Sequence, residues 1–290
     1  MDEQDDLAAR FDGARAHLRS VAYRMLGSAD EADDAVQEAW LRADRAGAAG
    51  IANVTGWLTT IVGRVCLDML RVRRRRAEEL TGLDGAGAAH EPSTGPEDEA
   101  VLADSVGLAM LVVLDTLGPA ERVAFVLHDM FSVPFDEIAV IVERSPVAAK
   151  KLASRARGRV RGAPATPAAD LVRQRTAVEA FLAAARSGDL DALLAVLAPD
   201  AVRRVDSGTL PIAEMRGARR IAEETATNTA RARVSEPALV NGAVGVVVAP
   251  RGRLLVVLEV SVEEGRIAAF TVVADPARLR SMDLAVLPPT

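Results

Sequence analysis

The residues of this chain best suited to a chemical role are the closely spaced cations of segment 137–160, EIAVIVERSPVAAKKLASRARGRV. Lysine and arginine bind phosphate oxygens, and arginine can also donate two parallel hydrogen bonds to the edge of a guanine. The chain as a whole has a net charge of −6, so a locally basic segment predicts a surface for a negatively charged partner. The cations are Lys150, Lys151, Arg155, Arg157 and Arg159.

The same segment has the pattern of two helices joined by a tight turn. Ile138, Ala139 and Val142 give the first helix an apolar face, while Ser145 suits the N-cap and Pro146 the first turn of the second helix. Small inward residues let the helices cross closely, as in a helix-turn-helix motif whose second helix enters the major groove. The alternative is a helical hairpin with a solvated basic face. The outward residues are Lys150, Lys151, Ser154, Arg155 and Arg157.

Two further charged surfaces lie on predicted helices nearer the N-terminus. The helix at 30–43 has an apolar side and an opposite face with Asp33, Asp34 and Glu38. The helix that begins near Trp57 ends in the arginine run at 73–76. Such a run can bind phosphates, or it can be a solvated helix end whose charge suits the helix dipole.

These patterns divide the chain into three folded parts and two linkers. Residues 1–80 and 101–163 are predicted to be all-α domains, and residues 170–290 an α+β domain. The intervening segments, 81–100 and 164–169, have the Gly, Ala and Pro content of linkers.

The C-terminal part combines helix signals with strand signals. Gly188 is predicted to end one helix, Asp189 to cap the next and Pro199 to end it. Beyond these helices, β-rich runs alternate with turn signals such as Asn241-Gly242 and Glu264-Gly265. An antiparallel meander of about four strands follows from this spacing.

Composition sets limits on function. Cys66 is the only cysteine, so no internal disulfide can form, and its apolar neighbours favour a buried core thiol over a nucleophile. The three histidines have no metal-ligand spacing, and we expect no metal or other cofactor. The acidic start and the short apolar runs predict a cytoplasmic protein without a membrane anchor.

The order of the helical segments resembles that of bacterial RNA polymerase sigma factors. FDGARAHLRSVAYRMLGSADEADDAVQEAWLRA, GWLTTIVGRVCLDMLRVRRRR and LDTLGPAERVAFVLHDMFSVPFDEIAVIVERSPVAAKKLASRAR are similar, in sequence order, to regions 2 and 4 of the extracytoplasmic-function type. The resemblance covers about residues 7–162. It implies binding to core polymerase through the β′ coiled coil and the β flap, recognition of the −35 and −10 promoter elements, and promoter melting.

The resemblance also assigns roles to individual residues. Near the N-terminus it implies polymerase contacts by Asp33, Asp34, Gln37, Glu38 and Arg42, with Trp40 as a further candidate. An extruded −10 base would meet Asn53, Thr55 and Trp57, although Trp57 could equally be a core residue. Backbone phosphates would be held by Arg64, Arg71, Arg73, Arg74 and Arg75. The −35 element would be read by Lys150, Lys151, Ser154 and Arg155, with Arg157 beside them.

The C-terminal part is similar to a SnoaL-like, cone-shaped domain, which a SigJ-like subgroup of these sigma factors carries after region 4. Of the subgroup's elements, the linker keeps Glu91-Pro92, and the glycine-rich element reads DSGTL at 206–210. The resemblance implies control of the sigma part in cis, so that no separate anti-sigma factor is required. The residues of the terminal element are Asp275, Pro276, Arg278 and Leu279.

Two other functions are compatible with the sequence. A helix-turn-helix regulator with a ligand-sensing domain would need a dimer surface, and it leaves the resemblance of residues 7–80 unexplained. A fused isomerase or cyclase would need an acid in an apolar pocket, for which Asp206 and Glu259 are the candidates. Fold similarity does not carry catalysis over, and we expect no enzymatic activity.

Overall fold

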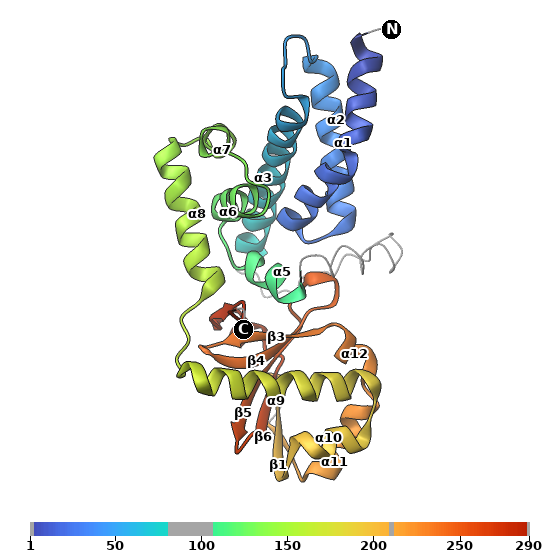
Figure 1. The fold of residues 1–290 in the computed structure, drawn as a ribbon, viewed down its shortest axis with the longest axis vertical. Helices are drawn as coiled ribbons and strands as arrows, with labels where there is room; N and C mark the ends of the chain where they lie inside the picture. The colour runs from blue at the N-terminus through green and yellow to red at the C-terminus, as the bar shows by residue number, and fades with distance from the viewer. Residues whose placement is uncertain (1–2, 81–106, 209–211, 289–290) are drawn as a thin grey trace. The chain divides into compact units, whose positions relative to one another are not determined.

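The computed structural model describes residues 3–80, 107–208 and 212–288. The predicted linker at 81–100, with its Glu91-Pro92, and residues 209 and 210 of the DSGTL element lie outside the described residues. The chain forms two compact units (Figure 1). Unit 1 consists of Met1–Val106 and Leu117–Gly158, and unit 2 of Gly107–Thr116 and Arg159–Thr290.

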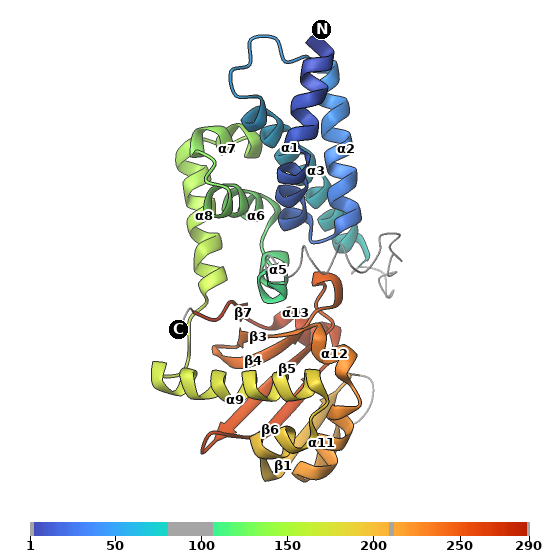
Figure 2. The ribbon, with the colours of Figure 1, turned by 45° about the vertical axis from the view of Figure 1, so that its right-hand side comes forward.

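Unit 1 begins with three long helices that pack against one another: α1 (Glu3–Leu26), α2 (Ala29–Ala46) and α3 (Val54–Leu80). Figure 2 shows α1 and α2 side by side. Ser28 caps α2 by accepting a hydrogen bond from the Glu31 amide, and Asp30 and Glu31 suit the positive end of the helix dipole. The buried face of α2 is built mostly from alanine, which allows the close helix packing.

The rest of unit 1 contains the helix-turn-helix. It comprises α6 (Pro119–Phe125), a π-helical turn η1 (Val126–Met130), α7 (Phe135–Val142) and α8 (Pro146–Arg161), of which residues up to Gly158 belong to this unit. Glu143 ends α7 in the left-handed conformation, and the Ser145 hydroxyl accepts a hydrogen bond from the Ala148 amide at 3.2 Å. The predicted roles of Ser145 and Pro146 at the start of the second helix are therefore confirmed.

Unit 2 contains the helices α9 (Ala168–Ser187), α10 (Leu190–Val196), α11 (Ala218–Ala226), α12 (Thr229–Arg233) and α13 (Pro276–Ser281). Gly188 ends α9 at a φ of 69°, and the Asp189 carboxylate accepts a hydrogen bond from the Ala192 amide at 3.0 Å, as predicted. The prediction that Pro199 ends the second helix was wrong. Helix α10 stops at Val196, and Pro199 lies in the strand that follows.

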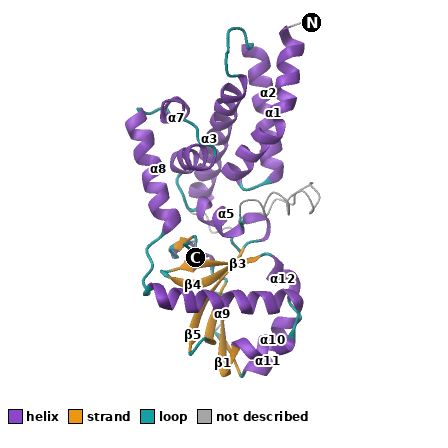
Figure 3. Ribbon diagram, in the orientation of Figure 1, coloured by secondary structure: helices purple, strands orange, loops and turns teal. Residues whose placement is uncertain are grey.

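A seven-stranded sheet forms the other layer of unit 2, in the order β2-β1-β6-β5-β4-β3-β7. The predicted antiparallel meander is present as β3 (Ser235–Val240), β4 (Ala243–Val248), β5 (Val256–Glu263) and β6 (Arg266–Val273). Three strands extend it: β1 (Leu197–Asp206), which runs parallel to β6, β2 (Ala213–Arg216) and β7 (Leu284–Ala285). Figure 3 shows α9 across one face of the sheet, where Phe181 packs on Phe270 with ring centroids 5.7 Å apart.

Unit 2 also includes the helix α5 (Leu108–Asp115), which precedes α6 in the chain. Helix α5 packs on β3, β7 and the short 3-10 turn η2 (Pro250–Gly252). The Glu236 carboxylate of β3 accepts a hydrogen bond from the Ala109 amide at 2.9 Å and so binds one of the free donors at the start of the helix. The predicted domain boundary at residue 163 remains a prediction, but the spatial units divide the chain elsewhere.

The end of α8 is fixed to the same unit. The Val160 carbonyl accepts a hydrogen bond from the Val286 amide at 2.9 Å. Next to it, Gly162 has a φ of +60°, and a Cβ placed there would lie 2.4 Å from the Cβ of Ala285. The Ala165 amide donates to the Gly242 carbonyl at 2.9 Å, so the segment predicted as a linker at 164–169 is hydrogen-bonded to the sheet domain.

Candidate functional site

The exposed face of α8 carries the residues predicted to read the −35 element. Lys150, Lys151 and Ser154 are exposed, and no side-chain partner is found for them in the described ranges. The Arg155 guanidinium lies 3.0 Å from the Glu121 carboxylate, but the Arg155 side chain is 63% exposed. The Glu121 side chain is only 14% exposed, so Arg155 pairs with a largely covered carboxylate while much of its own side chain stays accessible to another partner.

Arg157 differs from its neighbours on α8. Its guanidinium donates to the Asp129 carboxylate at 2.5 Å, and both side chains are largely covered, with 30% and 24% exposed. This pair joins α8 to η1 inside the helix-turn-helix unit. The geometry favours a role for Arg157 in holding α8 in place.

The outer face of α2 combines free and paired polar groups. Asp34 and Gln37 are exposed, and within the described residues their side chains have no partner. The other predicted contacts are engaged: Asp33 accepts from Arg19 at 2.7 Å, and Glu38 accepts from Arg42 at 2.8 Å. Trp40 is half-buried, with its ring 4.8 Å from that of Phe11.

The candidates for binding an extruded base lie at the start of α3. The Asn53 side chain accepts a hydrogen bond from the Gly56 amide at 2.9 Å and thereby caps the helix. Thr55 is exposed and Trp57 is half-buried. Part of the Trp57 surface is therefore packed, as in a core residue, and part is accessible, as a base-binding residue requires.

Three of the α3 arginines predicted to bind phosphate are held by protein groups. Arg64 donates to the Val140 carbonyl at 3.1 Å, Arg71 lies 3.7 Å from the Glu143 carboxylate, and Arg73 bonds the Leu26 carbonyl at 3.1 Å. Arg74 and Arg75 are exposed. The first two contacts reach α7, so α3 and the helix-turn-helix touch within unit 1.

Packing supports this contact between α3 and α7. A Cβ added at Gly63 of α3 would lie 3.2 Å from a methyl group of Ile141, which shows how closely the helices approach. Arg122 of α6 is only 2% exposed and lies near Gly27 and Cys66 of the three-helix part. The segments predicted to bind the −10 and −35 elements are thus packed together within unit 1.

Cys66 is fully buried in the three-helix part, as predicted for a core thiol. Burial raises the pKa of the Cys66 thiol far above its ordinary value. Within the described parts of the chain, no helix is both long and apolar enough for a membrane crossing.

Arg278 of α13 connects the predicted regulatory element to both acids proposed for catalysis. It donates to Asp206 at 2.6 Å and to Glu259. The hydrogen bond from Arg278, followed by that from the Gly208 amide, lowers the pKa of Asp206. We call Asp206, Glu259 and Arg278 the α13 clasp.

The remaining residues of the regulatory element shape α13. Asp275 caps the helix by accepting hydrogen bonds from the amides of Ala277 and Arg278. Pro276 occupies its first turn, and Leu279 is half-buried. A Cβ at Gly208 would lie 2.7 Å from the Asp275 carboxylate, so residues 206–208 meet the start of the 275–279 element.

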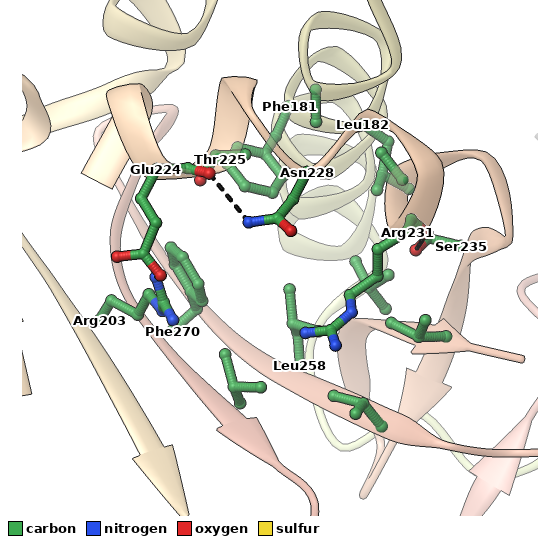
Figure 4. Close-up of a pocket in the computed structure, with 16 residues that line it drawn as sticks. Phe181, Leu182, Arg203, Glu224, Thr225, Asn228, Arg231, Ser235, Leu258 and Phe270 are labelled. Carbon is green, nitrogen blue, oxygen red and sulfur yellow. Dashed lines mark hydrogen bonds and ion pairs between the residues drawn. The ribbon is translucent and has the colours of Figure 1, made fainter. Parts of the chain in front are cut away.

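Unit 2 contains an apolar cavity that sequence analysis did not locate (Figure 4). Neither Asp206 nor Glu259 lines it; Glu259 follows Leu258, which does, and successive strand residues face opposite sides of the sheet. Its polar lining includes Arg203, Glu224 and Arg231. The sequence does place Arg203 on the same strand face as the apolar residue Ala201, two positions earlier, and Ala201 is buried. No local pattern points to Arg231.

Two family models match the chain: one described as Sigma-70 region 2 over residues 11–76, and one described as Sigma-70, region 4 over residues 108–160. A Mycobacterium tuberculosis protein named "Probable ECF RNA polymerase sigma factor SigI" is 34% identical over 284 residues, which cover 96% of this chain and 97% of the relative. "ECF RNA polymerase sigma factor SigJ" of the same organism is 43% identical over 209 residues, 71% of this chain and 67% of the relative. The crystal structure of M. tuberculosis SigJ is similar at 32% identity and a TM-score of 0.46, over 94% of this chain and 98% of that one.

Proposed function

Because this chain belongs to the extracytoplasmic-function RNA polymerase sigma factors, we propose that it binds core polymerase through α2, recognises the −35 and −10 elements and promotes melting. The observation that carries the proposal is the row of exposed donors on α8, the second helix of the helix-turn-helix, within the region 4 match. Lys150, Lys151 and Ser154 of this row have no side-chain partner among the residues that the structure describes. The test is run-off transcription by core polymerase on the gene's own upstream DNA. Transcripts that need this protein are expected, and their absence with folded protein would contradict the proposal.

Arg155→Ala is expected to flatten the preference among −35 variants. A bidentate base contact contributes about 1–3 kcal/mol of discrimination, whereas a phosphate contact strengthens all sequences alike. The measurement is transcription from a library of −35 variants. Arg75→Ala, at an exposed residue predicted to hold a backbone phosphate, is the comparison and should lower all promoters in parallel. An unchanged ranking with Arg155→Ala would remove Arg155 from the readers.

We propose further that unit 2 controls the sigma part in cis, without a separate anti-sigma factor. Support comes from the two ends of the region 4 match, which both belong to unit 2. Helix α5 is bound by Glu236 and packs on the sheet, and the Val160 carbonyl pairs with the Val286 amide. A change in unit 2 therefore reaches region 4 through two anchored segments.

Substitutions in the α13 clasp can test whether Asp206 acts in cis control, by holding Arg278, or has a role of its own. If Asp206 acts by holding Arg278, then Asp206→Asn and Arg278→Gln should change transcription in the same direction, and the double variant should be no worse than the stronger single one. The measurement is run-off transcription with all three variants at equal concentrations of folded protein. Additive effects of the two substitutions would show that Asp206 acts independently of Arg278.

A further inference from the structure

The cavity of unit 2 lies between the helical layer and the sheet. Its volume is about 100 Å³, and it opens to solvent. Phe181 and Leu182 of α9 form one wall, and Leu258, Phe270 and neighbouring valines of the sheet form the other. Apolar cavities of about 150 Å³ hold a benzene-sized group, so this smaller cavity has room for part of a hydrocarbon chain, and the rest of a ligand would project from the opening.

Some polar side chains that line the cavity have a hydrogen-bond or ion-pair partner within the described residues, and one does not. Arg203 lies 2.5 Å from the Glu224 carboxylate, and these two charges neutralise each other. The Asn228 amide nitrogen donates to the Glu224 carbonyl at 3.0 Å, which leaves its oxygen as an acceptor. For the Arg231 guanidinium, the described parts of the chain provide no hydrogen-bond or ion-pair partner.

Figure 4 shows the Arg231 side chain turned into the cavity from α12. Arg231 is an exposed residue, so its guanidinium is accessible from solvent beside the apolar wall. Such an arginine suits a planar anion, which it can bind through two parallel hydrogen bonds. A dianion such as a phosphate monoester fits less well, because the second arginine is already paired and Glu224 would repel the added charge.

From this arrangement we infer that unit 2 binds an apolar monocarboxylate. Its carboxylate pairs with Arg231, and its hydrocarbon part lies against Phe181, Leu258 and Phe270. Ser235, which lines the cavity, directly precedes Glu236, the residue that binds the start of α5. The occupied cavity therefore adjoins the strand that holds the first helix of region 4.

The test is isothermal titration calorimetry of the full chain with octanoate, and with octanamide as its uncharged counterpart. Octanoate is expected to bind with a Kd at or below about 1 mM, and octanamide at least about tenfold more weakly. Arg231→Gln should weaken octanoate binding at least about tenfold while leaving octanamide unchanged. Arg233→Gln, an exposed arginine of the same helix outside the cavity, is the matched control and should bind like the unaltered protein.

Three results would overturn the inference. They are no octanoate binding by the folded full chain, equal loss of affinity in Arg231→Gln and Arg233→Gln, and equal affinity for octanoate and octanamide. Circular dichroism checks that both variants fold. A second variant, Val272→Phe, narrows the cavity without touching Arg231 and should weaken octanoate and octanamide alike. Undiminished octanoate binding by folded Val272→Phe would also count against the site.

Discussion

The double substitution Asp34→Lys and Gln37→Lys is expected to abolish detectable co-purification with core RNA polymerase. Both side chains are exposed on the outer face of α2, and they have no partner within the described residues, so the fold should tolerate the change. Asp34→Lys reverses a charge and Gln37→Lys adds one, so the proposed interface gains two like charges that would repel a partner suited to an acidic face. We expect a tenfold to hundredfold loss of affinity, about 1.4–2.8 kcal/mol. The measurement is binding to immobilised core polymerase.

These two positions are better targets than Asp33 or Glu38. Reversal of Asp33 would break its ion pair with Arg19 of α1, and reversal of Glu38 would place two cations one helical turn apart. Glu223→Lys, an exposed acid of α11, is the control for a change in net charge and should leave binding intact. If the folded double variant binds core polymerase normally, α2 is not the contact.

Gly162→Ala is expected to destabilise unit 2 by about 2–5 kcal/mol. Alanine in the left-handed conformation costs about 1–2 kcal/mol, and its Cβ would overlap that of Ala285, where overpacking costs about 1–3 kcal/mol more. Because this position joins the end of α8 to β7, we also expect altered transcription. The measurement is the free energy of unfolding in urea.

Gly158→Ala provides a matched control only four residues earlier. Gly158 lies inside α8, and nothing lies within 4 Å of a Cβ placed there. Alanine should therefore stabilise the helix by about 1 kcal/mol. Equal effects of the two substitutions would show that the close approach to Ala285 does not constrain position 162.

Features set by neighbouring residues could be predicted from the sequence. Ser145, Gly188 and Asp189 act within a few residues of themselves, and all three have the predicted capping or terminating role. The meander was also predictable, since each turn joins strands that are adjacent in the chain. The helix-turn-helix follows from the same kind of local pattern.

Features that depend on distant residues were missed. The parallel pairing of β1 with β6 joins segments some sixty residues apart, and no local pattern encodes it. For the same reason Asp206 and Glu259 were considered as possible bases, because the sequence does not show that Arg278 binds both. The cavity arginines depend on how α11 and α12 cover the sheet, which is also a long-range property.

The position of α5 affects when region 4 can fold during synthesis of the chain. Its apolar residues, Leu111 to Leu114, are buried in unit 2, and one of its packing partners, β7, ends only at Ala285. A ribosome that adds about 5–20 residues per second needs roughly ten to thirty seconds to make the chain between them. During that interval α5 lacks this partner, so region 4 is expected to be complete only after β7 has been made. Prematurely terminated chains would then carry α2, the proposed polymerase contact, without a complete region 4.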